Sequence, residues 1–91
     1  MRIGRIIGTL IATRKDEKLT GSKLMITQPL DIELNPKGDP IVAVDTVGAG
    51  IGELIIYVTG TASRIAARKM DAPIDVAIVG IIDEISTMDL K

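Results

Sequence analysis

The pattern of apolar segments separated by charged or turn-forming ones predicts five β-strands. They are expected at residues 2–13, 22–30, 41–47, 53–59 and 74–85. Charged or turn-forming segments separate them, and the densest of these is Asn35–Pro40. The first strand contains Gly4 and Gly8, which indicate a bulge or a tight bend within it.

The hydrophobic period changes from that of a strand to that of a helix after Gly60. Thr61 is expected to cap a short helix there, and Asp71–Pro73 is expected to end it. One side of the predicted helix carries four apolar residues: Ala62, Ile65, Ala66 and Met70.

The fourth and fifth predicted strands differ in how their faces are divided. In the fourth, Leu54, Ile56 and Val58 share one face, and Tyr57 on the other is expected as an amphipathic wall residue. The fifth is apolar on both faces, with Val76, Ile78 and Ile82 on one and Ala77, Val79 and Ile81 on the other. A half-exposed antiparallel strand is normally polar on one side. We therefore expect a neighbouring subunit to cover the outer face of the last strand.

These elements predict a mainly β fold. Five short strands with one helix between the fourth and fifth are typical of a small, partly open β-barrel of the OB type. The 91 residues are expected to form a single domain, residues 1–91. A chain of this length begins with a marginal hydrophobic core, and it contains no cysteine for disulfides, so oligomerisation is the stabilising route that remains.

The amino-acid composition argues against several classes of function. Cysteine and histidine are absent, which removes thiol chemistry, the commonest general base and the commonest metal ligand. The longest apolar run, Val76–Ile82, is far shorter than the roughly 20 residues of a transmembrane helix. A net charge of −1 argues against a nucleic-acid or anionic-membrane partner. We therefore expect a cytoplasmic protein with no membrane partner.

The glycine-rich segment Gly48–Glu53 invites a nucleotide-binding interpretation, which its sequence does not support. The dinucleotide fingerprint requires glycine where Glu53 stands, and it requires a helix where a strand is expected. The acidic residues at the strand ends are expected to bond backbone amides or arginines: Asp45, Glu53, Asp75 and Asp83. No catalytic residue, cofactor site or metal site is predicted, and the chain is not expected to be an enzyme.

Two other functions are compatible with a small barrel. One is a binding module for nucleic acid or another ligand, although a single aromatic residue leaves no stacking platform for bases. The other is an accessory subunit of a metabolic enzyme. The basic residues Arg64, Arg68 and Lys69 are interpreted as a solvated or intersubunit salt-bridging face.

Three separated segments resemble the EutN/CcmL family, the vertex proteins of bacterial microcompartments. They are Gly4–Thr9 with Leu19–Leu24, Val42–Glu53 and Ile74–Asp83, in the family's order and covering nearly the whole chain. The chain departs from the family pattern after the fourth strand, where Gly60–Arg64 keeps the glycine and the arginine and permutes the small residues between them.

This resemblance implies an OB-like barrel that assembles into cyclic pentamers at the five-fold vertices of a shell. The partners it implies are further copies of the chain and the hexameric proteins of the shell facets. It leaves open whether the compartment is a carbon-fixing carboxysome or a catabolic one. Our hypothesis is that subunit contacts involve the glycine-rich segment and nearby positions: Gly48, Ala49, Gly50, Ile51, Gly52, Glu53, Arg64, Ala77, Val79 and Ile81.

Overall fold

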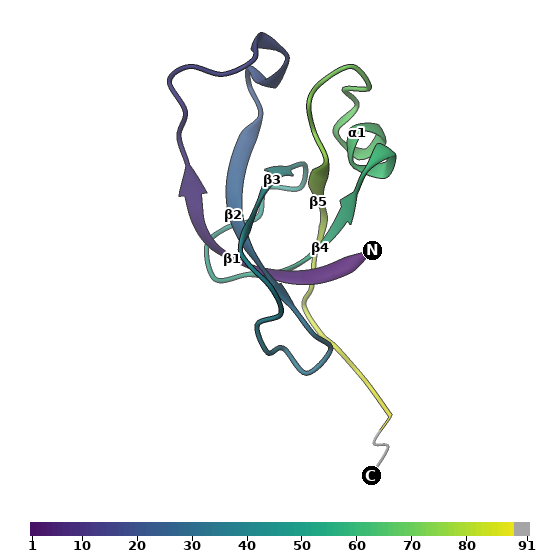
Figure 1. The fold of residues 1–91 in the computed structure, drawn as a ribbon. Helices are drawn as coiled ribbons and strands as arrows, with labels where there is room; N and C mark the ends of the chain where they lie inside the picture. The colour runs from purple at the N-terminus through teal and green to yellow at the C-terminus, as the bar shows by residue number, and fades with distance from the viewer. Residues whose placement is uncertain (89–91) are drawn as a thin grey trace.

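The wall of the molecule is built from five strands, as the pattern of apolar and turn-forming segments predicts. A computed structural model describes residues 1–88, and Figure 1 shows the arrangement of its elements. Each strand lies within its predicted segment and is shorter than expected, the first and last by the most. The strands are β1 Arg2–Leu10, β2 Lys23–Leu30, β3 Ile41–Asp45, β4 Leu54–Thr59 and β5 Val76–Ile81.

The strands form a closed barrel in the order β1-β2-β3-β5-β4, with β4 pairing back to β1. All pairs are antiparallel except β3 with β5, which are parallel through Val44 with Ala77 and Asp45 with Ile78. This pairing corrects the expectation of a partly open barrel. The wall closes because the end of β3 reaches β5, where Thr46 N–H also donates to the Ile78 carbonyl at 3.3 Å.

The core of the barrel is aliphatic apart from Tyr57. Its buried members come from all five strands and the loop after β3: Ile6, Met25, Ala43, Ala49, Ile55, Tyr57, Val76 and Ile78. On β4 the inward face is the one that carries Ile55 and Tyr57, so Leu54, Ile56 and Val58 face outward. Tyr57 is therefore a core residue, because the barrel places its ring inside the wall.

Bulges change the register in two places. The first lies in β1 between Ile6 and Gly8, where the glycines had indicated an irregularity. The second separates the pairs Ile56–Gly80 and Tyr57–Ile78, so Val79 has no partner on β4. An extra residue in a strand turns the following side chains to the other face. Ile81 consequently packs against the barrel core, which corrects its predicted place on the outer face.

The helix between β4 and β5 is present, and its details differ from the prediction. Helix α1 spans Thr61–Ala67 and packs against β4 and β5. Its N-cap is Gly60, and no side chain caps it, so Thr61 is the first helical residue and not the cap. Its one buried residue is Ser63, while the predicted apolar side is exposed at Ala62 and Ile65.

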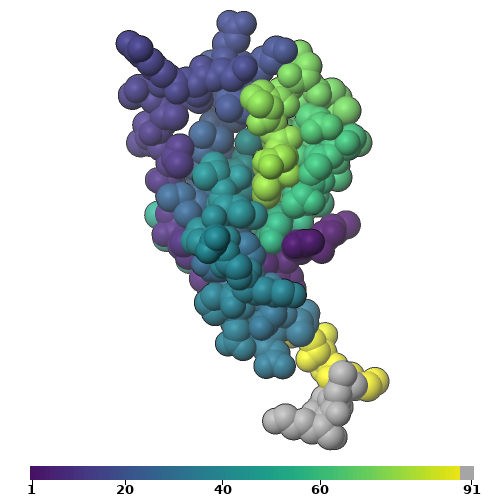
Figure 2. Space-filling view, viewed as in Figure 1, coloured from purple at the N-terminus to yellow at the C-terminus, as the bar shows by residue number. Residues whose placement is uncertain are grey.

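A second, smaller cluster lies outside the barrel wall. Val44, Ala72 and Ile74 are buried there, with Leu19, Leu24 and Ala67 packed around them. It joins the outer side of β2 and β3 to the segment after α1 and to the 3₁₀ turn η1, Glu17–Leu19. No helix among residues 1–88 has both the length and the apolar character that a membrane crossing requires. The segment after β5 projects away from the barrel (Figure 2).

Candidate functional site

The loop between β3 and β4 is held in one shape by the carboxylate of Asp45. Its Oδ1 accepts hydrogen bonds from the N–H groups of Val47 at 2.9 Å and Gly48 at 3.1 Å. Its Oδ2 accepts from the N–H of Ala49 at 2.9 Å. Gly48 has a φ of 77°, a left-handed conformation that costs glycine little. A single side chain thus binds three consecutive amides at the start of the loop.

The other end of the loop is held by Glu53 and Arg5. The N–H of Gly50 donates to Glu53 Oε1 at 2.6 Å, and Arg5 donates to the Gly52 carbonyl at 2.8 Å. Gly52 also has a positive φ, 90°, and its N–H donates to the carbonyl of Ile6 on β1. A side chain at Gly50 would place its Cβ 3.3 Å from Glu53 Oε1. Glycine at positions 48, 50 and 52 therefore allows the backbone of this loop to adopt its conformation.

This geometry confirms the predicted role of two of the four acidic residues and argues against phosphate binding. A phosphate-binding loop needs free backbone N–H groups that point at the ligand. Here Asp45 and Glu53 accept hydrogen bonds from the amides of residues 47 to 50. Bound phosphate would also face both carboxylates. The loop presents apolar groups instead, because Ile51 at its tip is 66% exposed.

The residues predicted to form a subunit contact are not gathered into one patch. Within the loop, Ile51 points to solvent and Ala49 belongs to the barrel core. Ala77 faces outward but is 0% exposed within a single chain, where α1 packs against β5. Arg64 donates to the Ile74 carbonyl at 3.5 Å and to Thr61 Oγ1 at 3.1 Å. Val79 lies half-buried at the β5 bulge.

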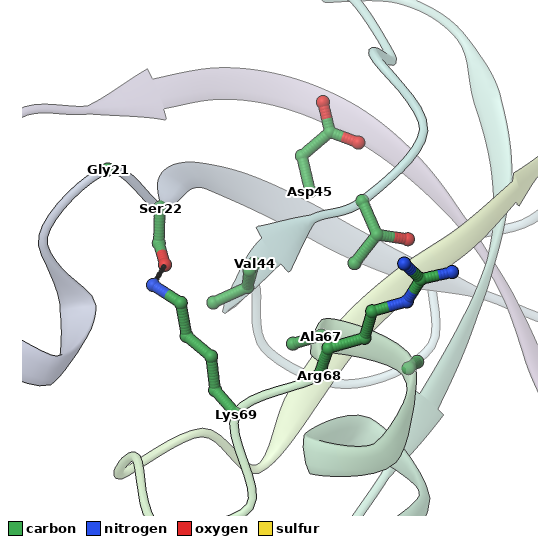
Figure 3. A pocket seen from close by; sticks show the side chains of 9 residues that line it. Gly21, Ser22, Val44, Asp45, Ala67, Arg68 and Lys69 are labelled. Carbon is green, nitrogen blue, oxygen red and sulfur yellow. Dashed lines mark hydrogen bonds between the residues drawn. The ribbon is translucent and has the colours of Figure 1, made fainter.

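Lys69 has a structural role that no sequence pattern indicated. Its ammonium group donates to the carbonyls of Lys18 and Thr20, each at 3.2 Å, and to Ser22 Oγ at 2.9 Å (Figure 3). These bonds tie the segment after α1 to the turn before β2. Lys69 is therefore not part of an exposed basic face, because all three ammonium hydrogens have acceptors within the chain.

A hollow of about 580 Å³ lies beside Lys69, between the end of α1 and the start of β2. Arg68 and Ser22 contribute to its lining, and the Asp45 carboxylate on its rim is turned away from both cations (Figure 3). Within residues 1–88 there is no group of three or more acidic, histidine or cysteine side chains that could hold a metal ion. The side chains around this hollow therefore connect neighbouring elements of the fold, as Lys69 does for the segment after α1 and the turn before β2.

Sequence comparison places the chain beside shell proteins of bacterial microcompartments. The sequence model of the family described as "Ethanolamine utilisation protein EutN/carboxysome" matches residues 1–83. The bacterial microcompartment shell vertex protein GrpN of Rhodospirillum rubrum is 43% identical over 89 residues, 98% of this chain and 100% of GrpN. The carboxysome shell vertex protein CcmL of Thermosynechococcus vestitus is 42% identical over 86 residues, 94% of this chain and 87% of CcmL.

Solved structures share the closed barrel and its helix. An ethanolamine utilization protein, EutN, superposes with a TM-score of 0.91 at 32% identity, over 96% of this chain and 91% of EutN. The pentameric microcompartment shell protein GrpN from Rhodospirillum rubrum superposes with a TM-score of 0.86 at 42% identity, over 98% and 100% of the two chains. The likeness thus extends over the full barrel in both sequence and structure.

Proposed function

We propose a structural function for this chain on the premise that it belongs to the EutN/CcmL family. It is a shell vertex protein of a bacterial microcompartment, where it forms cyclic pentamers that close the five-fold vertices. The observation that carries this conclusion is its match to pentameric GrpN, which covers almost all of both chains. No insertion large enough to add a second domain separates the two proteins.

The hexameric proteins of the shell facets are the proposed partners of the pentamer. A layer made only of hexamers is flat, and a five-fold unit in place of a hexamer introduces the curvature that closes a shell. The chain itself is proposed to have no catalytic role. The carboxylates of Asp45 and Glu53, which could have served acid–base chemistry, bond the backbone of their own loop instead.

The glycine-rich loop Gly48–Glu53 is proposed to contribute to the contact between subunits. Its tip residue Ile51 offers apolar surface on a backbone that Asp45 and Glu53 already hold in place, so little conformational entropy is lost on contact. Gly50→Leu should impair assembly more than folding of the single chain. Pentamers that formed normally with Gly50→Leu would exclude the loop from the contact.

Native mass spectrometry of the purified protein is the first test of the vertex function. Five chains of 9.7 kDa give a pentamer of about 48 kDa (5 × 9.7). A second measurement adds the pentamer to hexameric facet proteins and scores closed shells by electron microscopy. A stable monomer, or closed shells in equal yield without this chain, would contradict the proposed function.

A further inference from the structure

Two rows of apolar side chains lie on the outer surface of the barrel. The first, called here the β2 face, crosses three paired strands, where Gly8 of β1 lies beside Ile26 of β2 and Ile26 beside Val42 of β3. Ile26 lies between the inward residues Met25 and Thr27, and Val42 precedes the inward Ala43, so both side chains point outward. Val42 remains 45% exposed.

The second row, called here the β4 face, lies on β1, β4 and the end of β5. Its residues are Ile3, Leu54, Ile56, Gly80 and Ile82. The register pairs Ile56 with both Ile3 and Gly80, and Ile82 N–H donates to the Leu54 carbonyl at 2.9 Å. Leu54 and Ile56 alternate with the inward residues Ile55 and Tyr57, which turns them to the outside. The residues named for each face are uncharged, and Arg5 of β1, which pairs with Leu54, borders the β4 face and donates to the Gly52 carbonyl at 2.8 Å.

The two faces share one local design. On each, a glycine lies across from an isoleucine of the next strand, and the space above the glycine is open except for that isoleucine. A Cβ added at Gly8 would come to 3.5 Å from Ile26 Cδ1, and one added at Gly80 to 3.5 Å from Ile56 Cδ1. Each isoleucine therefore packs against the glycine of its own face, and the missing side chain lets another chain approach the backbone closely.

The faces are centred on different strands of the barrel, β2 and β4, and β1 contributes a residue to each. In the closed order β1-β2-β3-β5-β4, neither β4 nor β5 is bonded to β2. Figure 1 accordingly shows β2 on one side of the molecule and β4 and β5 on the other. Two different patches that are centred on strands not paired with each other can join chains head to tail into a ring.

We propose that the β2 face of one copy of this chain packs against the β4 face of the next copy around the ring. This inference rests on the proposed pentamer and names the surfaces that build it. The proposed contact buries the isoleucines and glycines of both faces, and Val42, which is 45% exposed in the single chain, is covered with them. The residues of both faces are uncharged, and the bordering Arg5 already donates to the Gly52 carbonyl of its own chain, so the contact is mostly apolar.

The test uses two matched variants, Gly8→Arg and Gly80→Arg. Each places a long cation on one face and leaves the other face intact. Both glycines lack the left-handed φ that would strain a side chain, and the added Cβ makes only ordinary contacts. Ile32→Arg is the control, because Ile32 is 60% exposed and belongs to neither face.

Native mass spectrometry should show the wild type and Ile32→Arg at about 48 kDa and each glycine variant at about 9.7 kDa, a fivefold loss of mass. Mixing the two glycine variants should give a dimer of about 19 kDa (2 × 9.7). Their intact faces can then make one contact, and the two blocked faces stop further growth. An isologous interface would not show this complementation.

A glycine variant that still forms pentamers would overturn the proposed faces while the wild-type pentamer upheld the vertex function. Two monomeric variants that give no dimer on mixing would overturn the pairing of these faces. A monomeric wild type would refute both proposals. If circular dichroism shows that either glycine variant is unfolded, Val42→Arg on the β2 face and Leu54→Arg on the β4 face make the same test, with the same expected masses.

Discussion

The hydroxyl of Thr27 is a polar group inside an otherwise aliphatic part of the barrel. Thr27 is 0% exposed, and within residues 1–88 its Oγ1 has no hydrogen-bond partner. The neighbouring strand β1 leaves room for the methyl group of Thr27, because a Cβ added at Gly4 would lie only 2.7 Å from Thr27 Cγ2. Gly4 is therefore explained by close packing of two strands and not by a bend.

Replacing Thr27 with valine should stabilise the barrel. Thr27→Val keeps the branched shape and removes a buried hydroxyl that lacks a partner, so the free energy of unfolding should rise by about 1 kcal/mol. Urea denaturation at one fixed protein concentration measures this change. Thr27→Ser is the matched control, since it keeps the hydroxyl and loses the methyl group, and it should lower stability. A lower stability for Thr27→Val would indicate that the hydroxyl has a partner.

Asp45 should contribute more to stability than an exposed aspartate. Removing its carboxylate in Asp45→Ala leaves three loop amides without their acceptor, and the free energy of unfolding should fall by about 2 kcal/mol. Asp75→Ala is the control, because the Asp75 side chain is exposed and its carbonyl, which accepts from Gly60 N–H, is retained. Equal denaturation midpoints for the two variants would contradict this role of Asp45.

At the scale of the elements, Lys69 joins parts of the chain that are distant in sequence. Lys69→Met should lower the free energy of unfolding by about 1–2 kcal/mol, because three hydrogen bonds between the segment after α1 and the turn before β2 are lost. Hydrogen exchange should become faster at Ser22, whose N–H donates to the Leu19 carbonyl within that turn.

Arg68→Met is the matched control for this loss of charge. Arg68 ends α1 with a φ of 57°, which methionine would retain at similar cost, and no hydrogen bond from its guanidinium is found in the described part of the chain. The free energy of unfolding and the hydrogen-exchange rates of Arg68→Met should stay close to those of the wild type. Equal effects of the two substitutions would assign the change to net charge and not to the contacts of Lys69.

The strands could be predicted from sequence because segments rich in apolar, often β-branched, residues are separated by charged or turn-forming segments. The inward face of β4 could not, since Ile55 makes both of its faces apolar. The bulge at Val79 was not predicted, although Gly80 lies beside it inside the strand, and it reversed the place of Ile81. Asp45 and Glu53 were correctly expected to bond amides, whereas Lys69 binds two backbone carbonyls, which carry no sequence signature.

At the scale of the whole molecule, assembly and folding should be thermodynamically linked. A ring that binds folded chains stabilises them by mass action, so the melting temperature should rise with protein concentration. For a pentamer of this chain length the rise should be about 4–8 °C for each tenfold increase. Differential scanning fluorimetry over two decades of concentration measures it. Gly80→Arg should show no such dependence, and a wild-type melting temperature that stayed constant would contradict the linkage.

The parallel pairing of β3 with β5 also sets an order of events while the chain is being made. β1, β2 and β3 can pair as antiparallel neighbours early, but β5 must bond both β3 and β4 before the wall closes. Closing the long connection between β3 and β5 has an entropic cost, which slows folding. Because β5 also supplies Gly80, a nascent chain that ends before residue 80 lacks a complete β4 face. In the proposed ring, growth should therefore start from finished barrels, and translation should delay recruitment of the next subunit.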